Sequence, residues 1–322
     1  MRSWARVIVV STLILACEID APAQSPTFRS ATELVNLNVT VVAANARPVT
    51  DLTPDRFEVF EDGIRQKLQF FAPGDLPVDV LLLVDTSGSM AASLPLVQQA
   101  AQRFVHALRP VDRASIMGVS NHLRVLQGLT GDIAALDRAI ASTKAGGRTL
   151  LYASIYTALT ELAKIRAASA SEARRQAMVV LSDGIDTSST FSFDELMANI
   201  HRHHAVPIYT IAPRSAKAMK AQRESVFGEN TATQDFELRK LATETGGRAF
   251  FPLALHELAG VYADIATELA HQYALGYQSS NRLLDGTFRR IAVRVAASGV
   301  KWRTRAGYVA EHATADNNSD QR

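Results

Sequence analysis

One short stretch constrains the fold of this chain more than any other: an almost unbroken apolar run that ends in a turn rich in oxygen atoms. Residues 78–84 read V-D-V-L-L-L-V, and Asp85, Ser87 and Ser89 follow directly. A run without alternation is typical of a strand that is buried on both faces of a parallel sheet. In open α/β sheets, ligands bind outside the carboxyl ends of such strands. The stretch therefore predicts a buried parallel strand with a ligand site at its end.

The turn after this strand has the chemistry of a metal site. Asp85 offers a carboxylate, and Ser87 and Ser89 offer hydroxyls at alternate positions. Gly88 between them allows a tight backbone path. Hard divalent cations prefer oxygen ligands, and Mg²⁺ is usually held by few charged groups together with waters. We therefore interpret residues 85–89 as the first part of a metal site.

From residue 78 to residue 272, apolar strands and amphipathic helices alternate, which predicts an α/β fold with a central, mostly parallel sheet flanked by helices. The expected helices cover residues 95–108, 133–143, 151–168, 192–204, 236–245 and 255–271. The expected strands cover residues 78–84, 113–120, 123–129, 177–181, 206–211 and 249–251. The link at Asn121-His122 is too short for anything except an antiparallel pair. Ser192 and Glu195 form a predicted capping box.

Short β segments flank this region on both sides. Strands are expected at residues 34–42, 57–60 and 66–71, and again at 273–277, 288–295 and 302–309. Neither group has enough strands for a stable core, but together they give about six. Chain termini of a compact domain often lie close together, so one domain can be inserted into another. We therefore expect an α/β domain over residues 76–272, inserted in a small β-sandwich-like domain built from residues 30–75 and 273–310. The alternative is a separate N-terminal hairpin with a C-terminal sheet extension.

The remaining segments carry no expected fold. Residues 214–233 are polar without periodicity and are expected to form a surface loop. Residues 311–322 are polar and are expected to be disordered. A net charge of +2 on 322 residues gives no reason to expect bulk attraction to nucleic acid or to an anionic membrane.

The first residues have the pattern of a targeting segment. Residues 1–6 carry two arginines, residues 7–16 are apolar, and Ala21-Pro22-Ala23 is a small-x-small cleavage pattern. This predicts a signal peptide over residues 1–23. Alternatively, residues 14–17 resemble a bacterial lipobox, in which Cys17 would become a lipid anchor. Both interpretations predict export to the periplasm, the cell surface or the medium. No second segment of membrane-spanning length is apparent, and cleavage after Ala23 would leave no cysteine for a disulfide.

Two further loops match the chemistry of residues 85–89. Residues 146–149 read G-G-R-T before a predicted helix, and residues 182–184 read S-D-G after a predicted strand. The three loops contain carboxylates and hydroxyls but no histidine or cysteine. Oxygen-only ligation suits Mg²⁺, Mn²⁺ or Ca²⁺ and argues against zinc.

D-T-S-G-S at 85–89, G-G-x-T at 146–149 and S-D-G at 182–184, in this order, resemble the von Willebrand factor type A domain, over roughly residues 76–272. In that family the three loops form a metal-ion-dependent adhesion site. The resemblance implies that Ser87 and Ser89 coordinate the metal and that Thr149 joins directly or through water. It also implies that Asp85 and Asp183 hold coordinated waters, and that one position stays open for a Glu or Asp of a partner. Residues 48–63 and 307–308 also resemble secreted bacterial relatives of this family.

The leading interpretation is an exported, non-enzymatic, metal-dependent binding module that captures an acidic residue of a protein partner. A structural or assembly component of a cell-envelope complex is the first alternative. A metal-dependent phosphohydrolase is the second, although Ser87 stands where haloacid-dehalogenase-type chemistry wants a second acid.

Several residues also have simpler interpretations. Thr149 is also a candidate N-cap of the following helix, and Asp186 is expected to be a solvated loop residue. A solvated helix end is favoured over a zinc site for three histidines, His201, His203 and His204.

Overall fold

The computed structural model describes residues 34–74, 76–168, 173–182, 186, 188–190, 192–203, 205–213 and 228–311. The predicted signal peptide, residues 214–227 of the predicted surface loop and residues 312–322 of the tail that was predicted to be disordered lie outside these ranges. No helix in the described ranges is long and apolar enough to cross a membrane.

A six-stranded sheet forms the centre of the α/β region, with the strand order β10-β9-β8-β5-β6-β7. Its strands are β5 (Val78–Asp85), β6 (Arg113–Val119), β7 (Leu123–Thr130), β8 (Arg175–Leu181), β9 (Ile208–Ile211) and β10 (Ala249–Phe250). Strand β5 pairs in parallel with β6 on one side and with β8 on the other. Strands β6 and β7 are antiparallel. The predicted mostly parallel sheet with one antiparallel edge is confirmed.

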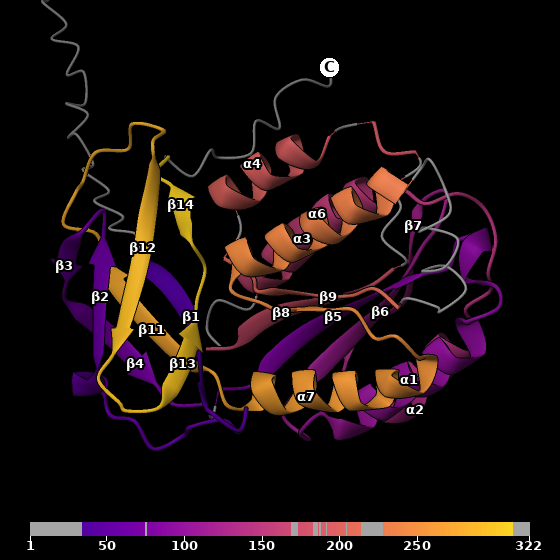
Figure 1. Cartoon of the computed structure of the whole chain (residues 1–322), viewed down its shortest axis with the longest axis horizontal. Coiled ribbons are helices and arrows are strands. Elements are labelled where there is room, and N and C mark those ends of the chain that lie inside the picture. The colour runs from indigo at the N-terminus through magenta and orange to yellow at the C-terminus, as the bar shows by residue number, and fades with distance from the viewer. Residues whose placement is uncertain are drawn as a thin grey trace, which may run out of the picture. The chain divides into compact units, whose positions relative to one another are not determined.

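Helices cover both faces of this sheet (Figure 1). One face carries α1 (Leu94–Ala107), α2 (Ile133–Ala141) and α7 (Leu258–Ala270), and the other carries α3 (Leu151–Ala168), α4 (Phe193–His203) and α6 (Gly228–Thr245). Val80 and Leu82 pack with the first group, whereas Leu81 and Leu83 pack with the second. Successive side chains of a strand point to opposite faces, so burial on both faces explains why the β5 sequence does not alternate.

The flanking β segments form two four-stranded sheets, with the orders β13-β1-β11-β4 and β14-β12-β2-β3. The strands are β1 (Leu34–Ala43), β2 (Phe57–Glu61), β3 (Ile64–Gln66), β4 (Leu68–Ala72), β11 (Tyr273–Gln278), β12 (Phe288–Val295), β13 (Val300–Arg303) and β14 (Gly307–Val309). Strand β1 pairs with β11, and β2 pairs with β12. Each sheet therefore joins strands from both sides of the α/β region, and one apolar core lies between them. This confirms the predicted fold class.

Short 3-10 helices complete the described elements: η1 (Pro54–Arg56), η2 (Gly88–Met90) and η3 (Leu255–Glu257).

Three predictions were wrong in detail. The segment predicted as one strand at 66–71 belongs to β3 and β4, and the one at 302–309 divides into β13 and β14. In both cases the chain crosses from one four-stranded sheet to the other within the predicted strand, so the segment forms two shorter strands. Helix α6 begins at Gly228 and not at residue 236, so residues 228–233 are not a loop.

Candidate metal site

The carboxylate of Asp85 lies at the carboxyl end of β5 and is 1% exposed. Its Oδ1 accepts a hydrogen bond from the backbone N–H of Ser87 at 2.8 Å. Its Oδ2 accepts one from the hydroxyl of Ser182 at 2.6 Å. Ser182 directly follows β8, which is the parallel neighbour of β5. Two of the three predicted loops therefore meet at the Asp85 carboxylate, and both of its oxygens are held in place.

The hydroxyl oxygens of Ser87 and Ser89 lie 2.9 Å apart. Ser87 is buried, whereas Ser89, in η2, is exposed. Both side chains therefore point to the same side of the turn. The pair offers one oxygen from inside the site and one from its rim.

The loop that contains Thr149 docks on the first loop through its backbone. The N–H of Gly88 donates to the carbonyl of Gly147 at 3.0 Å, and the N–H of Gly146 donates to the carbonyl of Thr86 at 2.7 Å. Gly147 has a φ of +82°, which glycine adopts readily. Thr149 itself is 3% exposed. The first two predicted loops are thus fixed to each other at backbone level.

Of the third loop, Ser182 is described, but Asp183 lies outside the described residues. Asp186 is not the solvated residue that we expected. Its Oδ2 accepts a hydrogen bond from the backbone N–H of Tyr152 at 2.8 Å, in the first turn of α3. The N–H of Ala153 donates to the hydroxyl of Ser189 at 3.1 Å. These are donors that a helix N-cap normally satisfies, so Asp186 and Ser189 take the capping role that was the alternative for Thr149.

The donor set of the described residues fits a hard divalent cation. It consists of one carboxylate, on Asp85, and of the hydroxyls of Ser87, Ser89 and Thr149. The hydroxyls of Ser87 and Ser89 are hydrogen-bonded to each other, and their 2.9 Å separation is also compatible with adjacent ligands in an octahedral shell of about 2.1 Å radius, the distance that Mg²⁺ demands. Among the described residues, no group of three or more His, Cys, Asp or Glu side chains is placed to hold a metal ion. Oxygen donors of this kind are those that Mg²⁺, Mn²⁺ and Ca²⁺ prefer.

Tyr152 links the start of α3 to two other helices. Its hydroxyl donates a 2.6 Å hydrogen bond to Glu237 of α6, and its ring packs against Phe193 of α4 with centroids 5.8 Å apart. Burial raises the pKa of the Tyr152 phenol, and the hydrogen bond to the Glu237 carboxylate raises it further. The phenol therefore stays protonated and remains a hydrogen-bond donor.

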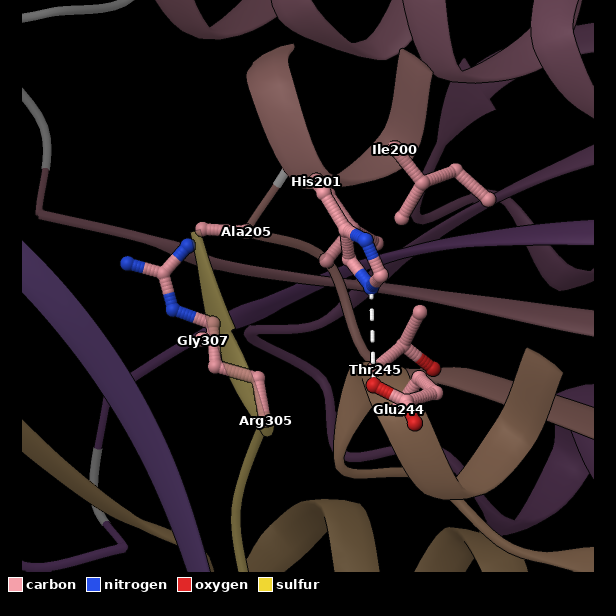
Figure 2. A pocket seen from close by; sticks show the side chains of 8 residues that line it. Ile200, His201, Ala205, Glu244, Thr245, Arg305 and Gly307 are labelled. Carbon is pink, nitrogen blue, oxygen red and sulfur yellow. Dashed lines mark ion pairs between the residues drawn. The ribbon is translucent and has the colours of Figure 1, made fainter. Parts of the chain in front are cut away.

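His201 is not at a solvated helix end. Its side chain is 19% exposed, and its ring centroid lies 4.9 Å from that of Phe288. Figure 2 shows the imidazole reaching from α4 towards Glu244 of α6, with Arg305 beside it; Nε2 lies 3.5 Å from Oε2 of Glu244. The prediction of a solvated position is therefore wrong for His201. The side chain of His203 and the whole of His204 lie outside the described residues.

Our sequence interpretation missed the roles of Ser182, Asp186 and Ser189. Ser182 could have been found from its position, because it directly follows the strand expected at residues 177–181. The pairing of Asp186 with Tyr152 spans 34 residues and leaves no spacing signal in the sequence.

Comparisons with known proteins agree with the resemblance noted from the three loops. The sequence model of the von Willebrand factor type A domain matches residues 80–185. The chain is 27% identical to a UPF0353 protein of Mycobacterium marinum over 68% of each chain. It is 28% identical to UPF0353 protein MAV335 of Mycobacterium avium, over 69% of this chain and 68% of that protein.

Two solved structures are similar to this chain. A von Willebrand factor type A protein from Catenulispora acidiphila has a TM-score of 0.46 and 12% identity, over 89% of this chain and 76% of that one. The vWF domain of the type V pili tip protein Mfa5 from Porphyromonas gingivalis has a TM-score of 0.45 and 15% identity, over 60% of this chain and 94% of that one. Since the sequence match spans all three predicted loops, this chain is a protein with a von Willebrand factor type A domain.

Proposed function

We propose that this chain is an exported, non-enzymatic binding module that captures an acidic residue of a protein partner through a bound divalent cation. Asp85, Ser87, Ser89 and Thr149 would hold the ion together with Asp183, and Mg²⁺ is the favoured ion over Mn²⁺ or Ca²⁺. The bound cation would supply a Lewis-acidic centre with one position for a Glu or Asp carboxylate. Export is supported by the pattern of residues 1–23, with Cys17 as an alternative lipid anchor.

The observation that carries this proposal is the way in which Asp85 is held. Both carboxylate oxygens accept hydrogen bonds from the surrounding loops, while two serine hydroxyls stand 2.9 Å apart beside them. A shell that is built mainly of hydroxyls leaves the cation with much of its charge. An incoming carboxylate therefore gains strongly by completing the shell. This arrangement supports capture of an acidic group.

The same geometry disfavours hydrolysis with Asp85 as the nucleophile. A carboxylate that accepts hydrogen bonds on both oxygens is stabilised in its charged form and is therefore less nucleophilic. Position 87 holds a serine, where the phosphatase chemistry would need an acid. A binding role is therefore the better interpretation of the site.

The test is capture of partners from the native cell envelope, with and without EDTA, by the wild-type protein and three variants. Ser87→Ala and Asp183→Ala should lose the partners that EDTA also releases. Ser298→Ala is the matched control, because this exposed serine lies in the turn between β12 and β13. Binding that persists in EDTA and in Ser87→Ala would overturn the proposal. If EDTA and Ser87→Ala lower the melting temperature but leave partner binding intact, the structural alternative is correct.

A further inference from the structure

The first turn of α3 is capped by residues from a distant loop and not by its own neighbours. The N–H of Tyr152 donates to Oδ2 of Asp186, and the N–H of Ala153 donates to Oγ of Ser189. The Ser189 hydroxyl in turn donates to the same Oδ2 at 2.5 Å. The loop that follows β8 is therefore tied to the start of α3, shortly after Thr149.

The two oxygens of Asp186 serve different parts of the structure. Oδ2 reaches across to α3, whereas Oδ1 accepts hydrogen bonds from the N–H groups of Ser188 and Ser189 at 3.0 and 2.8 Å. One oxygen thus holds Ser188 and Ser189, and the other attaches Asp186 to the helix. Both carboxylate oxygens of Asp186 are thus engaged in hydrogen bonds to backbone N–H groups.

Thr149 lies between two fixed points. On one side, the Gly147 carbonyl accepts the N–H of Gly88, which joins the Thr149 loop to the Ser87–Ser89 turn. On the other side, Tyr152 is held by Asp186 through its backbone and by Glu237 through its hydroxyl. The N–H of Arg148 also donates to Oδ1 of Asn121, and that of Leu150 to the carbonyl of Ser120, so the Asp186 attachment is one of several that hold the Thr149 segment beside Asp85.

We propose that Asp186 and Ser189 are positioning residues that set the metal affinity of the site by holding Thr149 in register with Asp85 and Ser87. This inference rests on the proposed function, because it presumes that these residues bind a divalent cation. In this role Asp186 and Ser189 would act without contacting the ion. Loss of such supporting hydrogen bonds around metal sites typically lowers the affinity by about 10- to 100-fold.

The chain offers a matched control for Asp186. Asp132 caps α2, where its Oδ1 accepts the N–H of Ala135 at 3.1 Å. Asp132 follows the end of β7. The neighbouring Gly131 lies close to the carbonyl of Asp112, just before the start of β6. Asp132 therefore lies at the amino end of β6, whereas Asp85 lies at the carboxyl end of β5, the parallel neighbour of β6. Asp186→Ala and Asp132→Ala each remove a capping carboxylate, but only the first one touches the Thr149 segment.

The experiment measures the Mn²⁺ and Mg²⁺ affinities of the full chain by calorimetry, with melting temperatures beside them. We expect Asp186→Ala to raise the metal Kd about tenfold or more, and Asp132→Ala to leave it within about twofold of wild type. Ser189→Ala should weaken binding, and Ser189→Thr, which keeps the hydroxyl, should restore it. Asp186→Asn keeps one acceptor oxygen. Its NH₂ group would face either the Tyr152 N–H or the N–H groups of Ser188 and Ser189, so one of these sets of hydrogen bonds would be lost. This variant provides the test if Asp186→Ala does not fold.

Hydrogen exchange of the metal-free proteins gives a second readout. Asp186→Ala should accelerate exchange at the amides of Tyr152 and Ala153, whereas Asp132→Ala should accelerate it at Ala135. If the wild-type protein binds metal and Asp186→Ala binds it with the same affinity, this inference is wrong and the proposed function stands. A wild-type protein that binds neither Mn²⁺ nor Mg²⁺ would overturn both.

Discussion

The phenolic O–H of Tyr209 donates a 2.6 Å hydrogen bond to the buried carboxylate of Glu268, which joins β9 to α7. The same carboxylate oxygen accepts hydrogen bonds from Arg303 of β13 and from the hydroxyl of Thr40 of β1. Burial raises the pKa of Tyr209, and the Glu268 charge raises it further, so the phenol remains a donor. This cluster connects α7, the last helix of the α/β region, to the β13-β1-β11-β4 sheet.

Tyr209→Phe should destabilise the protein by about 1–3 kcal/mol, because the buried Glu268 carboxylate would lose a donor. Tyr262 provides the control: it is fully buried, and its hydroxyl has no hydrogen-bond partner in the described part of the chain. Tyr262→Phe should therefore be neutral or stabilising. Urea denaturation of the two variants measures the difference. Equal losses in both would contradict the role assigned to Tyr209.

Removal of the metal should destabilise the wild-type protein and leave Ser87→Ala unaffected. A ligand that binds only the folded state stabilises it by about 2.7 kcal/mol when its free concentration is 100 times its Kd. We therefore expect EDTA to lower the free energy of unfolding of the wild type by about this amount under those conditions. Ser298→Ala should behave as the wild type does. An equal effect of EDTA on Ser87→Ala would exclude that hydroxyl as a ligand.

Gly147→Ala should weaken both the fold and the metal site. Gly147 has a φ of +82°, and an added Cβ would lie 2.9 Å from the amide atoms of Asn121, which accepts the N–H of Arg148. Gly63 has nearly the same φ, +83°, with nothing within 4 Å of such a Cβ. Both alanine variants should lose about 1–2 kcal/mol through the left-handed backbone.

Of these two variants, we expect Gly147→Ala alone to lose metal affinity as well, because the Gly147 carbonyl joins the Thr149 loop to Gly88. Calorimetric titration with Mn²⁺ and urea denaturation separate the two effects. If Gly63→Ala lowers the metal affinity as much as Gly147→Ala does, the loss comes from general destabilisation.

The parts of the structure that were predictable from the sequence are those with a local signal. Strand β5 has an unbroken apolar run because both of its faces are buried, and Asp85 ends it. The capping box of α4 follows from the spacing of Ser192 and Glu195, and the structure has both of its hydrogen bonds. Such features depend on neighbouring residues and so can be recognised without the fold.

The features that were missed have no local signal in the sequence. The division of residues 302–309 into β13 and β14 reflects two different partners: β13 pairs with β1, more than 200 residues away, and β14 pairs with β12, 17 to 21 residues away. Residues 228–235 are polar without apolar periodicity, so the start of α6 carries no pattern. The capping of α3 by Asp186 joins two loops that only the parallel arrangement of β5 and β8 brings together.

Acidification should destabilise the protein through His201. Burial lowers its pKa below the ordinary 6.5, and Lys240 and Arg305 lower it further, against the opposing effect of Glu244. The unfolded chain therefore takes up this proton at a higher pH than the folded one. The stabilising contribution is complete above about pH 6.5 and is lost as the pH falls through the lowered pKa of the folded state.

The stability difference between wild type and His201→Gln, measured by urea denaturation at pH 7.5 and at pH 5, should shrink at the lower pH. The same difference at both pH values, or an NMR titration of the His201 ring with a midpoint above 6.5, would show that the folded state does not favour the neutral imidazole.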